Sequence, residues 1–88
     1  MGTVDDLADA LAKDVLEAAD EMNNPMLVDD VAGVILAQSQ TLQEAFMTAI
    51  RVRRSERAGR AYLAKRIKMA AEGKTAPLPP TADNPDIH

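Results

Sequence analysis

The sequence predicts an all-α fold, either a small antiparallel helical hairpin or a three-helix bundle, followed by a disordered C-terminal tail. Three observations predict it. Apolar residues recur at steps of three and four over most of the chain. Alanine, the strongest helix former, supplies 16 of the 88 residues. Four of the five prolines lie after residue 73, which leaves the preceding region almost free of helix breakers.

The first helix is expected over residues 4–22. Thr3 can cap its N-terminus, with Asp6 three residues later in the sense of a capping box. One face carries the apolar residues Leu7, Leu11, Val15, Ala18 and Met22. Pro25 ends the helix and makes Asn24 a natural N-cap for the next one. The short connection predicts that the first two helices pack as an antiparallel hairpin.

From Pro25 to Gly73 the helical pattern is almost continuous, and it can break at more than one position. We expect helices over 25–52 and 55–72, with Ser55 capping the second. An unbroken helix is the first alternative, and it would give an elongated hairpin that dimerises. A break near 39–41 is the second alternative, because Thr41 and Glu44 form a capping box. In each case residues 3–72 form one helical domain, and 73–88 form a flexible, proline-rich tail.

The predicted core is thin for a lone domain of this size. Only Phe46 and Tyr62 are aromatic, and alanine buries little area. Self-association or a partner would supply the missing buried surface. The candidate partner interface is the apolar face Leu27, Val31, Ile35, Leu42, Phe46 and Ile50. Gly33 and Gly59 weaken their helices, and a close helix–helix approach would offset that cost.

Charge is divided unequally along the chain. Residues 1–50 hold ten acids and one base, residues 51–74 hold nine bases and two acids, and the tail adds two acids, so −9 + 7 − 2 gives the net charge of −4. The two blocks are expected to face each other, within one chain or between chains. Exposed ion pairs add little stability, so these charges would mainly select orientation.

The alternative interpretation of the basic block is contact with a nucleic acid. Arginines 53, 57 and 60 lie on one side of a helix and could neutralise phosphates. The candidate anion contacts are Arg51, Arg53, Arg54, Arg57, Arg60 and Lys65. The acidic first half argues against this interpretation, because it would repel the same polyanion.

Catalytic, cofactor and metal sites are not expected. Cysteine is absent, and His88, the only histidine, falls in the predicted tail. Ser39 and Ser55 therefore have no histidine in the helical region to activate them. The adjacent acids at 29 and 30 point about 100° apart on a helix, which suits solvent better than a cation. No basic leader or long apolar run is visible, which indicates a cytoplasmic protein without a membrane span.

The sequence thus predicts a small, non-enzymatic helical module that binds another protein, including a second copy of itself. A nucleic-acid-associated regulator that uses residues 51–68 is the alternative. No small-molecule substrate is evident.

Overall fold

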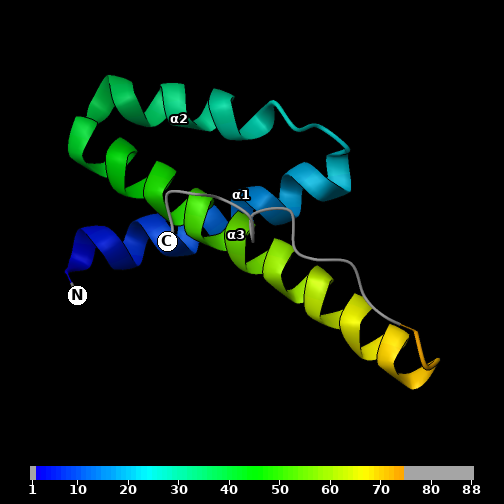
Figure 1. Ribbon diagram of the computed structural model, residues 1–88. Coiled ribbons are helices and arrows are strands. Elements are labelled where there is room, and N and C mark those ends of the chain that lie inside the picture. Colours follow the sequence, from blue (N-terminus) through cyan, green and yellow to red (C-terminus); the bar gives the residue numbers. More distant parts are fainter. Residues whose placement is uncertain (1, 75–88) are drawn as a thin grey trace, which may run out of the picture. The chain divides into compact units, whose positions relative to one another are not determined.

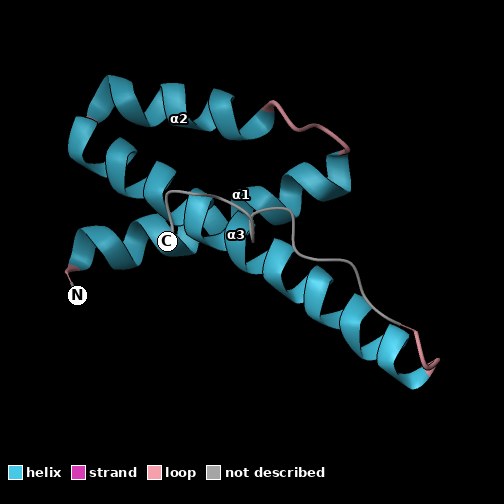
Figure 2. Ribbon diagram, in the orientation of Figure 1, coloured by secondary structure: helices cyan, strands magenta, loops and turns pink. Residues whose placement is uncertain are grey.

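The computed structural model describes residues 2–74, and its only regular elements in that range are three helices: α1 (Thr3–Met22), α2 (Leu27–Gln38) and α3 (Gln40–Ala71) (Figure 2). The predicted all-α class is confirmed. The chain divides into two compact units, Met1–Ser55 and Glu56–His88. The proline-rich tail predicted for 73–88 lies, from residue 75 onward, outside the described residues.

The first unit is a bundle of α1, α2 and the part of α3 that ends at Ser55. α2 packs against α1 and runs back along it, and α3 then reverses direction again (Figure 1). All three helices contribute to one core. Its central side chains are Phe46 and Ile50, which are 0% and 1% exposed. The buried hydrophobic residues are Ala8, Ala12, Val15, Leu16, Ala19, Val28, Ala32, Ile35, Phe46 and Ile50.

The buried face of α1 differs from the predicted one. Leu7 and Met22, both assigned to the apolar face of the first helix, are 59% and 60% exposed. The helix instead turns its alanines inward, and Ala8 and Ala12 have no exposed surface. Small side chains let neighbouring helices approach closely, so the face that packs deepest is not the face with the bulkiest residues.

The connection between α1 and α2 uses its two asparagines differently from the prediction. Asn23 adopts the left-handed conformation (φ 52°, ψ 44°) that asparagine tolerates better than most residues. The Asn24 side chain accepts a hydrogen bond from the backbone N–H of Met26 at 3.1 Å. This local turn holds Pro25 outside the helix, so α2 begins at Leu27 and not at Pro25.

The helix breaks at Ser39, so the expected break near 53–55 is wrong and the alternative near 39–41 is correct. Ser39 has an extended backbone (φ −158°, ψ 110°), and its Oγ accepts a hydrogen bond from the N–H of Leu42 at 3.1 Å. It is therefore the N-cap of α3, in place of Thr41. Around Ser55 the chain holds neither proline nor glycine and is rich in arginine, a good helix former, so α3 continues.

In the second unit, the described residues 56–74 contain the rest of α3 and its C-terminal cap. No side chain in this range is buried. Gly73, at φ 73°, occupies the predicted position beyond the last turn, where glycine avoids the strain of a left-handed residue. Among the described residues, no helix combines the length and the apolar character needed to cross a membrane.

Candidate interaction surfaces

The residues predicted as a partner interface lie in or against the core of the first unit. Ile35, Phe46 and Ile50 are buried. The other three, Leu27, Val31 and Leu42, are half-buried and pack against that core. These side chains are occupied by contacts within the chain, so the face proposed from the sequence has to be corrected. Helical periodicity identified apolar residues that pack together but did not show that α1 would cover them.

Large apolar side chains are exposed elsewhere. In the first unit they are Val4, Leu7, Met22, Met26, Val34, Leu36 and Val52. In the second unit they are Leu63 and Ile67, which are 55% and 61% exposed. Gly59, Leu63, Ile67 and Ala70 follow one another at steps of four, four and three, which places them on one face of the helix. We call this face the apolar stripe.

Two arginines border the apolar stripe. At 100° per residue, Arg60 and Arg66 each lie about 60° from Leu63, on opposite sides. Arg60 pairs with Glu56 one turn earlier. Arg66 donates a hydrogen bond to the hydroxyl of Tyr62 at 3.1 Å, and its guanidinium lies 5.9 Å from the centre of that ring. These contacts hold both guanidinium groups along the helix surface.

The other predicted anion contacts are distributed over both units. Arg51 and Arg54 are exposed in the first unit, and Arg57 and Lys65 are exposed in the second. Arg53 is held by Asp9, with Nε to Oδ1 and Nη2 to Oδ2 both at 2.8 Å. This two-bond geometry joins the acidic and basic blocks within one chain, as one of the two interpretations of the charge division predicts.

The Asp9–Arg53 pair also shifts the titration of its carboxylate. The hydrogen bond from Arg53, assisted by the positive charges of Arg53 and Lys13, lowers the pKa of Asp9, while partial desolvation acts in the opposite direction. Both side chains remain partly exposed, at 33% for Arg53 and 54% for Asp9. Solvent therefore screens the pair, which orients the two helices more than it stabilises them.

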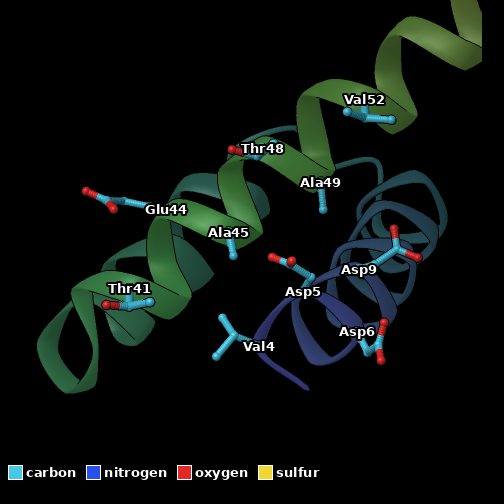
Figure 3. Close-up of a pocket in the computed structure, with 10 residues that line it drawn as sticks. All are labelled: Val4, Asp5, Asp6, Asp9, Thr41, Glu44, Ala45, Thr48, Ala49 and Val52. Atoms are coloured by element: carbon cyan, nitrogen blue, oxygen red, sulfur yellow. The ribbon is translucent and has the colours of Figure 1, made fainter. Parts of the chain in front are cut away.

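A groove of about 660 Å³ lies between the first turns of α1 and the beginning of α3, inside the first unit. Figure 3 shows the Asp5 side chain directed into the space between the helices, towards Ala45 and Ala49. The exposed side chains of Val4 and Val52 add apolar surface to it. The lining residues are Val4, Asp5, Asp6, Asp9, Thr41, Glu44, Ala45, Thr48, Ala49 and Val52. We call it the acidic groove.

The pattern of bulky apolar residues does not predict the acidic groove, because it places Leu7 and Met22 on the buried face of α1, where the structure has Ala8 and Ala12. Asp5 and Asp9 lie about 60° and 100° from the fully buried Ala8, on the same side of α1, so they border the packed face. The spacing of the buried alanines in α1 carries this signal. On α3, Ala45 and Ala49 of the groove each precede a core residue, Phe46 or Ile50.

The residues considered in the sequence for catalysis or metal binding are the two serines, the acids and the histidine. The Ser39 hydroxyl caps α3, and Ser55 is exposed on its surface. Within residues 2–74, no three potential metal-binding side chains converge on one point, and this includes the acids at 21, 29 and 30. His88 lies outside the described residues.

Comparison with known families, with curated proteins and with solved structures gives no match for this chain. What the protein does must therefore be inferred from its own residues.

Proposed function

We propose that this protein is a small, non-enzymatic helical module that binds other protein surfaces, including a second copy of itself. One observation carries the proposal. The described part of the second unit is a helix with no buried side chain, although it holds Leu63 and Ile67 on one face. We expect the module to act in the cytoplasm without a cofactor.

Residues 56–74 lack the packing that stabilises most helices in proteins. A helical segment of about 12–15 residues is marginal in water by itself, and most helices in proteins gain their stability by packing an apolar face. Complete burial of a leucine or isoleucine side chain contributes about 1.5–3 kcal/mol. A partner that covers the apolar stripe would therefore supply stabilisation that residues 56–74 lack.

Light scattering and sedimentation over a wide concentration range test this proposal. Wild-type mass is expected to rise with concentration, and Leu63→Ser is expected to remain monomeric. Leu36→Ser is the matched control, because Leu36 on α2 is exposed to a similar extent, 52% against 55%. A monomeric wild type would contradict self-association, and equal effects of the two substitutions would contradict the role of the stripe.

A nucleic-acid-associated regulator remains the second candidate. Within the described residues Arg54, Lys65 and Lys68 make no ion pair, so they are available to phosphates. The occupation of Arg53 by Asp9 and of Arg60 by Glu56 weakens the predicted row of arginines. A salt series with duplex and single-stranded oligonucleotides separates the candidates. Binding that falls steeply with salt, with a slope reduced in Lys65→Ala/Lys68→Ala, would favour the second candidate.

A further inference from the structure

We infer that the apolar stripe of one copy docks in the acidic groove of another copy. This inference rests on the proposed self-association and names the two surfaces that would meet. The acidic groove and the apolar stripe are different surfaces, so the contact is not between two copies of the same surface. It can close as a reciprocal pair or continue from copy to copy.

Charge complementarity is the first argument. Asp5, Asp6 and Glu44 add negative charge to the groove beside Asp9, whose charge is already matched by Arg53. Residues 56–74 carry six bases and two acids, a net charge of +4. Like-charged surfaces resist association, whereas opposite potentials steer it and fix its orientation. A positively charged helix is therefore the occupant that this groove favours.

The pattern of apolar and charged groups is the second argument. In the groove, the small residues Ala45 and Ala49 lie beside exposed valines, the Asp5 carboxylate is directed towards the two alanines, and further carboxylates line the groove. On the helix, Leu63 and Ile67 form the centre and Arg60 and Arg66 form the borders. The side chains of Leu63 and Ile67 would contact the alanines, and Arg66 would reach a carboxylate of the groove. Arg60 would exchange Glu56 for a groove carboxylate, because an exposed ion pair such as Arg60–Glu56 is only weakly stabilising.

The two surfaces also match in length. The groove follows α3 from Thr41 to Val52, and the stripe follows the helix from Gly59 to Ala70. Each covers eleven residue steps, or about 17 Å at 1.5 Å per residue. Gly59 lies at one end of the apolar stripe. A Cβ added there would meet no atom within 4 Å, so no contact within the described chain requires glycine at this position. A neighbouring helix that approaches closely at Gly59 would supply the reason.

Complementary variants test the inference in the full-length chain. Asp5→Lys/Asp6→Lys alters only the groove, and Arg60→Glu/Arg66→Glu alters only the stripe. Each variant alone is expected to raise the dissociation constant of self-association at least about tenfold. Mixed together, they retain one intact groove and one intact stripe. The mixture is expected to form a 1:1 complex of twice the 9.5 kDa chain mass.

Matched controls reproduce the charge changes elsewhere. Asp29→Lys/Asp30→Lys reverses two adjacent acids in the first turn of α2, as the groove variant does in the first turn of α1. Lys65→Glu/Lys68→Glu reverses two bases on the side of the helix away from Leu63. Both controls are expected to self-associate within about threefold of wild type. Far-UV circular dichroism verifies that every variant remains helical.

Disulfide trapping gives a second measurement that does not depend on charge. The chain has no cysteine, so Ala49→Cys on one copy and Leu63→Cys on another provide a unique pair. Oxidation of the mixture is expected to give the heterodimer, and replacing Ala49→Cys by Leu36→Cys is expected to reduce its yield at least about tenfold.

The outcomes separate the inference from the proposed function. If Leu63→Ser abolishes association but the groove variant associates normally, the stripe binds another surface and the inference is wrong, while the proposed function stands. If the mixed variants stay monomeric, the inference is also wrong. If the wild type is monomeric at every concentration, both self-association and the docking inference fail.

Discussion

The two units of this chain share one continuous helix but differ in what holds that helix in place. Up to Ser55, α3 places Phe46 and Ile50 in a core shared with α1 and α2. From Glu56 to Lys74 no side chain is buried. The first region is stabilised by tertiary packing, and the described part of the second is stabilised by local hydrogen bonds, by short-range pairs such as Glu56–Arg60 and by its terminal glycine.

The length of a helix and the length of the part that it buries in the core are separate properties in this chain. α3 extends for 32 residues, yet its buried residues fall within its first eleven. Helix propensity explains the remainder, because residues 56–71 consist mainly of alanine, arginine and lysine. A helix maintained in this way keeps its side chains available for contacts with other molecules.

Phe46→Ala should have the largest effect. Truncating a fully buried phenylalanine removes apolar contacts and leaves a cavity, so we expect the free energy of unfolding to fall by about 3–5 kcal/mol. Urea titrations followed by circular dichroism measure it. Leu63→Ala, at low protein concentration, should change the same free energy by less than about 0.5 kcal/mol. Equal losses would show that the two regions are stabilised in the same way.

Substitution of Gly33 or Gly59 by alanine should have a smaller effect, and it should stabilise the helix instead of destabilising it. An added Cβ at Gly33 or at Gly59 meets no atom within 4 Å, so alanine should stabilise either helix by up to about 1 kcal/mol. Gly33→Ala should raise the unfolding midpoint of the first unit. Gly59→Ala should instead slow amide hydrogen exchange around residues 56–71, with little change in that midpoint. A change in the midpoint from Gly59→Ala would show that the helix unfolds as one unit.

Removal of the Asp9–Arg53 ion pair should change the stability of the fold least, and the change should depend on pH. The pKa of Asp9 is lower in the folded chain than in the unfolded chain, so its stabilisation is complete above the unfolded pKa. It is lost as the pH falls below about 4 through the folded pKa. The unfolding midpoints of wild type and Asp9→Asn should therefore differ slightly at pH 6 and converge in acid. Asp14→Asn is the control, and a constant difference across this range would contradict the assignment.

The helix boundaries show which features of the structure could be predicted from the sequence. The hairpin, the end of α1 and the terminal glycine follow from local signals of proline, asparagine and glycine. The break at Ser39 was harder to locate, because Ser39, Thr41 and Ser55 are all chemically able to cap a helix. The change from the acidic to the basic block after residue 50 coincides with the last buried residue of α3, Ile50, and not with the end of the helix.

The surfaces were harder to predict than the helices. Periodicity correctly grouped Phe46 and Ile50 but did not show whether α1 or a partner would cover them. The division of charge did predict an acidic–basic contact, and Asp9–Arg53 is such a contact. The acidic groove depends on which face of α1 turns inward, and alanines such as Ala8 and Ala12 decide that. Their small transfer free energy gives them little weight in a hydrophobicity pattern.

Ser39, the single residue between α2 and α3, sets which side of α3 faces the other helices of the first unit. Ser39 alone connects Gln38 to Gln40, so the connection has no further residues that could accommodate an insertion or a deletion. An insertion that lengthened α3 just after its cap would rotate the following residues by about 100° per added residue. Phe46 and Ile50 would then turn away from α1, and after a one-residue insertion the smaller Ala45 and Ala49 would take their places. The single residue whose hydroxyl caps α3 thus fixes which side of that helix, up to Ser55, faces the core of the first unit.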